Sequence, residues 1–182
     1  MSNSPVSTAI DADGVGWITF DDPNSRANVF NPAMFSALGE AITALAGAEA
    51  LKAVVLISAK EKIFMAGADL RWLATLPDGA AAAKVSRVGQ EIFERVAGFK
   101  VPVVCAIHGA CAGGGFELAL ASTWRVASAA RETTIGLPEV GVGLMPGWGG
   151  GVRLPRLVGA VAAAGHILKA ALLPAADALK AG

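Results

Sequence analysis

The chain has 182 residues, of which 54% are hydrophobic and 16% charged, and its formal net charge is zero. This length predicts a single domain over residues 1–182. Because no basic stripe is present, nucleic acid is not expected as a partner. Residues 1–14 lack the basic and apolar regions of a signal peptide, and no apolar stretch is long and uncharged enough to predict a membrane span.

The mean hydropathy of +0.54 is high. It indicates either strands covered on both faces or surface hidden in an oligomer. The two cysteines, Cys105 and Cys111, lie in an apolar strand pattern and the turn after it. We interpret them as buried, unreactive thiols. With no disulfide framework, the sequence fits a reducing cytosol, so we expect a cytoplasmic protein.

The first predicted elements form a strand, a helix and a second strand. Residues 15–20 alternate apolar and polar side chains, which predicts a strand. Asn31 and Pro32 are typical of an N-cap followed by proline at the first helical position, and apolar residues then recur at helical spacing. Residues 53–58 form a continuous apolar run, which predicts a strand buried on both faces.

The same alternation of strand and helix continues to the C-terminus. Helical patterns cover residues 80–99 and 113–122, and the remaining strand patterns cover residues 101–107 and 124–128. From Pro155 onward the pattern is helical again. This order predicts an α/β fold with parallel strand pairing.

Two segments of small residues follow predicted strands. Gly113–Gly115 opens a helix, where free N–H groups and the helix dipole favour negative charge. The segment fits neither a dinucleotide-binding turn nor a P-loop, because the residues that those motifs require do not follow it. The second segment, Ala66–Leu70, could offer an N–H to the same oxygen, and Asp69 could also cap the helix that follows.

Two isolated glutamates accompany these segments. Glu117 lies three residues after Gly114 among apolar neighbours, and Glu139 follows Pro138 in a loop. Each has a plain interpretation: Glu117 as a first-turn acid that complements the helix dipole, and Glu139 as a solvated loop residue. We favour the alternative that both are catalytic acids, because a buried unpaired carboxylate is costly.

Three stretches together resemble the enoyl-CoA hydratase/isomerase (crotonase) superfamily. They are AGADL at residues 66–70, PVVCAIHGACAGGGFELALA at residues 102–121 and IGLPEVGVGLMPGWGGGVRLPRLVG at residues 135–159. The last stretch is most similar to the N-terminal hydratase/isomerase domain of multifunctional fatty-acid oxidation proteins. The resemblance implies a crotonase-like spiral of repeated ββα turns, with the family's C-terminal helical region apparently missing from a domain truncated at its C-terminal end.

The resemblance also implies a site. Ala68 and Gly114 would supply two backbone N–H donors to a thioester carbonyl, and Glu117 and Glu139 would match the family's catalytic pair. Acyl-CoA would lie against Arg26, Ala66, Ala68, Asp69, Leu70 and Arg71. Coenzyme A would be part of the substrate, and no metal or other cofactor is expected.

The expected activity is therefore hydration of a trans-2-enoyl-CoA in fatty-acid β-oxidation. Isomerisation of a Δ3-enoyl-CoA to its Δ2 isomer and a non-catalytic acyl-CoA-binding or assembly domain remain open. A serine peptidase of a related fold is disfavoured, because no serine lies on the turn before Glu117. The implied partner is a second copy in a trimer-type homo-oligomer, or the rest of a larger fatty-acid oxidation protein.

Two further residues have open interpretations. His108 precedes the glycine turn, and we expect it to hold that turn through a hydrogen bond rather than to act on substrate. Trp148 would either narrow the acyl pocket or simply pack in the core.

Overall fold

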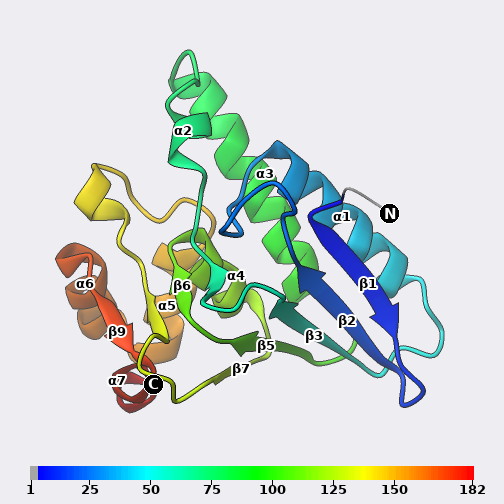
Figure 1. The fold of residues 1–182 in the computed structure, drawn as a ribbon. Helices are drawn as coiled ribbons and strands as arrows, with labels where there is room; N and C mark the ends of the chain where they lie inside the picture. Colours follow the sequence, from blue (N-terminus) through cyan, green and yellow to red (C-terminus); the bar gives the residue numbers. More distant parts are fainter. Residues whose placement is uncertain (1–3) are drawn as a thin grey trace.

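The computed structural model describes residues 4–182, and its larger sheet has five strands in the order β1-β2-β3-β5-β7 (Figure 1). Strand β1 is antiparallel to β2, and the remaining neighbours are parallel. The bounds are Val6–Ile10 for β1, Val15–Phe20 for β2, Ala53–Ser58 for β3, Val103–Ile107 for β5 and Trp124–Ala127 for β7.

A second, smaller sheet has four short strands in the order β4-β6-β8-β9. Strands β4, β6 and β8 are parallel, and β9 is antiparallel to β8. Their bounds are Ile63–Met65, Ala110–Ala112, Thr134–Gly136 and Leu172–Pro174. No helix within residues 4–182 combines the length and apolar character that crossing a membrane requires.

The chain alternates between the two sheets in repeated ββα units. Strands β3, β5 and β7 each lie in the larger sheet, and each is followed by a short strand, β4, β6 or β8, in the smaller one. A helical segment comes next: α2 (Leu70–Leu73) and α3 (Gly79–Ala97), then α4 (Gly114–Ala121), then the 3₁₀ helix η1 (Glu139–Val142). The mixed α/β class that the sequence predicted and the ββα spiral that the resemblance implied are confirmed.

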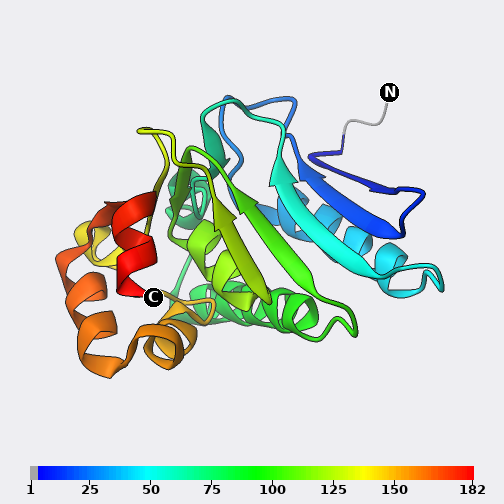
Figure 2. The same ribbon diagram turned by 90° about the horizontal axis from the view of Figure 1, so that it is seen from below.

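Helices α1 (Pro32–Ala46) and α3 lie along one face of the larger sheet (Figure 2). Their apolar faces supply much of the core, including Met34, Leu38 and Phe93, whose side chains have no exposed surface. Helices α5 (Gly150–Val158), α6 (Ala160–Lys169) and α7 (Ala175–Ala181) gather at the end of the molecule opposite β1 and β2 (Figure 1).

Most predicted elements occur where the sequence placed them. Asn31 caps α1 by accepting a hydrogen bond from the Met34 N–H, and β2 and β3 have the predicted bounds. Strand β3 alternates buried and half-buried residues, so it is not buried equally on both faces. The last predicted helix begins at Gly150 rather than at Pro155, which lies inside α5.

Candidate active site

The three parallel strands of the smaller sheet end at one cavity of about 490 Å³. Ala68 follows β4, Gly114 follows β6 and Glu139 follows β8, and all three line this cavity. Ligands of parallel α/β sheets commonly bind beyond the carboxyl ends of the strands. The ββα repeat therefore brings together residues that are more than 70 positions apart in the sequence.

Two backbone N–H groups beside the cavity lack partners. Within residues 4–182, neither the Ala68 N–H nor the Gly114 N–H donates a hydrogen bond. The two turns are in contact, because a Cβ added at Gly67 would lie 3.5 Å from the Gly114 nitrogen. The Gly114 N–H is also at the first turn of α4, where the helix dipole adds positive potential. Both groups are thus available to an electronegative ligand atom.

The glycine turn before α4 depends on the absence of side chains. Gly113 has a φ of 53°, which favours glycine. A Cβ on Gly114 would lie 2.1 Å from the Trp148 ring, and one on Gly115 would lie 2.3 Å from the Met65 carbonyl oxygen. The turn can therefore bring the backbone close to both the cavity and β4 only with glycine at these positions.

Glu117 is buried, with 1% of its surface exposed, and its carboxylate is anchored at one oxygen. Oε1 accepts hydrogen bonds from the Trp148 N–H at 2.8 Å and the Gly150 N–H at 2.7 Å. Gly150 allows this approach, since a Cβ there would lie 3.0 Å from Oε1. Both of the hydrogen bonds that the carboxylate accepts from residues 4–182 go to Oε1, and Glu117 also lines the cavity.

Burial raises the pKa of Glu117 from 4.5 to about 7, and the nearby charge of Glu139 adds to the rise. The two backbone N–H groups and the Arg153 guanidinium oppose this rise, because they favour the ionised carboxylate. A carboxyl group that titrates near neutral pH suits general acid–base catalysis. The interpretation of Glu117 as an ordinary first-turn acid does not account for this environment.

Glu139 begins η1 and is half-buried. Its Oε2 is buried without a hydrogen-bond partner among residues 4–182, and burial raises the pKa of this carboxyl group. A Cβ added at Gly113 would lie 3.3 Å from the Glu139 Oε1. Glu139 is therefore not the solvated loop residue of the plain interpretation but a desolvated acid beside the glycine turn.

The rest of the cavity is largely apolar. Its lining includes Leu73, Leu76 and Val85 from the α2–α3 region and Leu144 and Met145 from the loop after η1. An apolar cavity with a few polar groups at one end is typical of a site for a small, mostly hydrophobic ligand.

Trp148 forms one wall of the cavity and also packs in the core. Its ring makes edge-on contacts with Phe30, Phe35 and Phe93, with centroids 5.1–6.0 Å apart. Trp148 therefore does both things that the sequence left open: its ring packs against the phenylalanine cluster and also limits the cavity on that side.

Buried Asn28 holds the segment that carries Ala68 in place. The Asn28 carbonyl oxygen accepts from the Ala66 N–H at 2.9 Å, and Phe30 then exchanges backbone hydrogen bonds with Gly67 and Asp69. The Asn28 side chain donates to the Ser58 hydroxyl and to two backbone carbonyls, of β2 and β4. The sequence did not single out Asn28, because Asn24 and Asn31 lie close to it and nothing in the pattern shows which asparagine is buried.

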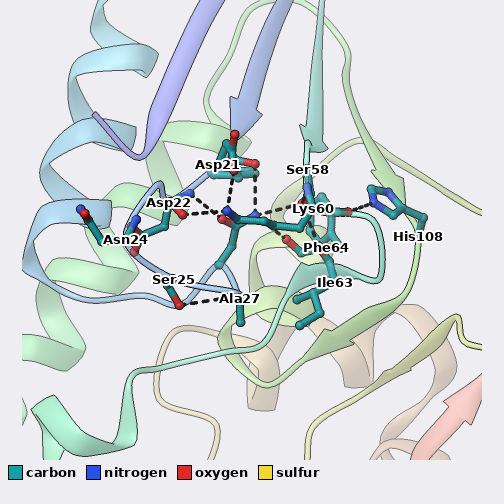
Figure 3. Close-up of polar contacts among 12 residues, drawn as sticks. Asp21, Asp22, Asn24, Ser25, Ala27, Ser58, Lys60, Ile63, Phe64 and His108 are labelled. Carbon is teal, nitrogen blue, oxygen red and sulfur yellow. Dashed lines mark hydrogen bonds and ion pairs between the residues drawn. The ribbon is translucent and has the colours of Figure 1, made fainter. Parts of the chain in front are cut away.

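The same polar cluster includes His108 and Lys60 (Figure 3). The His108 Nε2 lies 2.6 Å from the Lys60 carbonyl oxygen, and the Ser58 hydroxyl donates to the Ile63 carbonyl. Lys60 also pairs with Asp21. His108 thus has the structural role that the sequence predicted, but its partner is the connection between β3 and β4 rather than the glycine turn.

Of the other residues predicted to bind coenzyme A, some line the cavity and others do not. Ala66 and Leu70 line the cavity with Ala68. Asp69 caps α2 by accepting from the Arg71 and Trp72 N–H groups. Arg26 and Arg71 are exposed and do not line the cavity, so their contact with coenzyme A stays a prediction.

Neither cysteine lines the cavity. Both cysteines are buried, and burial raises the pKa of each thiol, as expected for unreactive core residues. Among residues 4–182, no group of three or more His, Cys, Asp or Glu side chains is arranged to hold a metal ion.

Sequence comparison finds relatives that extend well beyond this chain. The alpha subunit of the fatty acid oxidation complex of Vibrio campbellii is 40% identical over 176 residues, which are 97% of this chain and 25% of that protein. The corresponding subunit of Idiomarina loihiensis is 42% identical over 170 residues, 93% of this chain and 24% of that protein. The chain spans about a quarter of the length of these curated relatives.

Structure comparison finds the same fold in solved enzymes. The enoyl-CoA hydratase of Geobacillus kaustophilus has a TM-score of 0.93 and 26% identity, covering 100% of this chain and 67% of that one. The enoyl-CoA hydratase of Thermoplasma volcanium has a TM-score of 0.90 and 30% identity, covering 98% and 69%. The sequence model described as enoyl-CoA hydratase/isomerase matches residues 11–182. The chain therefore belongs to the enoyl-CoA hydratase/isomerase family.

Proposed function

We propose that this chain adds water to a trans-2-enoyl-CoA, giving a 3-hydroxyacyl-CoA. One observation carries the proposal: two unpartnered backbone N–H groups and two desolvated carboxyl groups line the same cavity. The chemistry of an enoyl thioester needs both, because negative charge develops on the thioester oxygen while protons move at C2 and C3.

The backbone groups would act on the thioester carbonyl. The Ala68 and Gly114 N–H groups would donate to its oxygen, and the donation would strengthen as the oxygen becomes an enolate. Donors of this kind are fixed before the reaction and are worth about 3 kcal/mol each in the transition state. The apolar side chains of the cavity would hold the acyl chain.

The two glutamates would move the protons. Water between them would lose a proton to Oε2 of Glu117 while its oxygen bonds to C3, and Glu139 would give a proton to C2. A proton would then pass from Glu117 back to Glu139 to restore the starting state. This assignment needs Glu117 ionised and Glu139 protonated. Burial raises the pKa of both groups, and at about 7 the pKa of Glu117 leaves a large ionised fraction at neutral pH.

The test follows the loss of enoyl-thioester absorbance with crotonyl-CoA. We expect Glu117→Gln and Glu139→Gln to lower kcat by about 10²–10⁴-fold each, because each removes one proton-transfer group. Acyl-CoA binding should persist, since the amides keep the shape of the site. Glu91→Gln, an exposed change on α3 outside the cavity, is the control and should keep wild-type turnover.

Δ3–Δ2 enoyl-CoA isomerisation is the second candidate, and the unpartnered buried oxygen of Glu139 favours it. One carboxyl group that is not held by hydrogen bonds could take a proton from C2 and return it to C4. Under this alternative, Glu117→Gln keeps isomerase turnover while Glu139→Gln abolishes it. Assaying hydration and isomerisation on the same preparations separates the two functions.

We also propose that the activity belongs to fatty-acid β-oxidation, within a larger oxidation protein or a homo-oligomer. The names of the curated relatives and the quarter of their length that this chain spans support this context. A non-catalytic binding role remains the alternative for the chain alone. It predicts acyl-CoA binding with no turnover in either assay.

A further inference from the structure

Arg153 lies on α5, outside the cavity, yet it contacts the turn that anchors Glu117. Its Nη1 donates to the Trp148 carbonyl oxygen at 3.1 Å, and its Nη2 pairs with the Glu94 carboxylate on α3 at 2.5 Å. One guanidinium therefore ties the turn before α5 to α3. The N–H of the same Trp148 residue donates to Glu117.

The turn leaves room for this side chain. Gly149 has a φ of 113°, and a Cβ there would lie 2.1 Å from the Arg153 Nη1. The Arg153 side chain is mostly buried, at 13% exposure, whereas its partner Glu94 is 74% exposed. The positive charge of the ion pair is thus the buried partner, and the negative charge of Glu94 is the exposed one.

We propose that Arg153 is a positioning residue for Glu117: it fixes the 148–150 turn that binds the Glu117 carboxylate, and its charge favours the ionised form that accepts a proton. The role rests on the proposed proton transfer to Glu117. It adds a group that does not touch the substrate and that favours the ionised form of Glu117 through the turn it holds and the charge it carries.

The charges around Glu117 support this role. Burial and the charge of Glu139 raise the pKa of Glu117, whereas the two backbone N–H groups and, to a smaller extent, Arg153 lower it. Glu94 contacts Arg153 and not Glu117. Arg125, on the neighbouring strand β7, donates to carbonyls at the C-terminal end of α4. Arg153 is therefore the cation positioned to oppose burial and the charge of Glu139.

The test compares Arg153→Gln, Arg153→Lys and Glu94→Gln in the enoyl-CoA assay as a function of pH. Arg153→Gln should move the acid limb of the kcat profile upward by a fraction of a pH unit, because it removes a cation whose effect on Glu117 is smaller than that of burial or of the two N–H groups. Its kcat at pH 7 should fall roughly tenfold, since the turn is also loosened. KM should change little, because no substrate contact is lost.

Arg153→Lys keeps the charge and should return the limb most of the way toward the wild-type pH. Glu94→Gln removes the tie to α3 but keeps the Arg153 charge and its bond to the Trp148 carbonyl, so the acid limb should stay at the wild-type pH. A purely structural role for Arg153 would lower kcat in both arginine variants without moving the limb, and this result would overturn the proposal.

A second measurement does not need turnover. The titration of the Glu117 carboxyl group, followed by ¹³C NMR with Glu117→Gln as the assignment control, should shift upward in Arg153→Gln. If the chain catalyses neither reaction but the titration shifts, the proposed function fails and the role of Arg153 stands. If a folded Arg153→Gln protein titrates at the wild-type pH, the positioning role is wrong whatever the activity.

Discussion

At the scale of single residues, burial and hydrogen bonding act in opposite directions on the ionisation of Glu117. A carboxyl group with 1% exposure is costly to ionise, and the chain offsets part of this cost with two backbone N–H groups and one arginine. The offset is incomplete, so the pKa of Glu117 stays near 7. The burial that gives the carboxyl group a pKa suited to proton transfer therefore also lowers the stability of the folded chain when that group is ionised.

The pH dependence of stability should report this imbalance. The pKa of Glu117 is higher in the folded chain, at about 7, than its ordinary value of 4.5, so its contribution to stability is present below pH 4.5 and is lost as the pH rises through 7. Because this rise corresponds to about 3 kcal/mol, we expect Glu117→Gln to increase the free energy of unfolding at pH 8 by about 2–3 kcal/mol.

Urea denaturation at pH 4 and pH 8 measures this effect. The difference between Glu117→Gln and wild type should be largest at pH 8 and close to zero at pH 4. Glu91→Gln, which changes an exposed carboxyl group, should show no such trend. An equal difference at both pH values would contradict the assigned origin of the effect.

At the scale of elements, the two sheets are joined by the side chain of Asn28. It donates to the Phe20 carbonyl of β2, the Ser58 hydroxyl of β3 and the Phe64 carbonyl of β4. Its Oδ1 accepts from the Asp22 N–H. One fully buried amide thus connects three strands to the segment that carries Ala68.

Asn28→Ala should therefore affect both stability and activity. Since several buried polar groups would lose their partner, we expect unfolding to cost about 3 kcal/mol less than in wild type. We also expect kcat to fall in the crotonyl-CoA assay, because the Ala68 N–H is less well fixed. Asn24→Ala, in the exposed part of the same loop, is the control and should change stability by less than about 0.5 kcal/mol.

The sequence was sufficient to predict the longer elements but not the second sheet. Strands β2 and β3 and helix α1 carry clear periodicity or a cap, such as Asn31 before Pro32. Strands β4, β6 and β8 have three residues each, too few for a periodic pattern, and only the family resemblance implied them. Strand β1, with four of five residues exposed, gave no alternation to detect.

Some residues of the candidate site could be identified from the sequence and others could not. Small-residue turns and the isolated Glu117 and Glu139 are visible in the sequence, but only the family resemblance singled out Ala68 and Gly114 as the two N–H donors. Asn28 and Arg153 were not identified, because their importance lies in contacts with residues 30 or more positions away or in another element's turn. A polar residue in a loop or helix gives no sign of such a partner until the chain is folded.

At the scale of the whole molecule, packing is uneven from one end to the other. Strand β3 pairs with β2 on one side and β5 on the other, whereas α7 has no buried residue. A second cavity of about 410 Å³ lies beside α7. Elements with few buried contacts open locally at low free energy.

Amide hydrogen exchange should follow this gradient. We expect the slowest exchange in β3 and its neighbours and the fastest in Ala175–Ala181, because opening α7 exposes little apolar surface. Mass spectrometry of peptides from both regions measures the difference, with α1 as a helical reference that has six buried residues. Equal protection in α1 and α7 would contradict this expectation.

The Trp148 ring lies between two positions that have no side chain, and this links their permitted substitutions. A Cβ would lie 2.3 Å from the ring at Gly89 and 2.1 Å at Gly114. A saturation library covering these positions should therefore show strong epistasis: Gly89→Ala is expected to be harmful alone and better tolerated with Trp148→Leu. Widening the cavity beside Trp148 would then require paired changes, because the backbone at these positions and the indole ring have to be redesigned together.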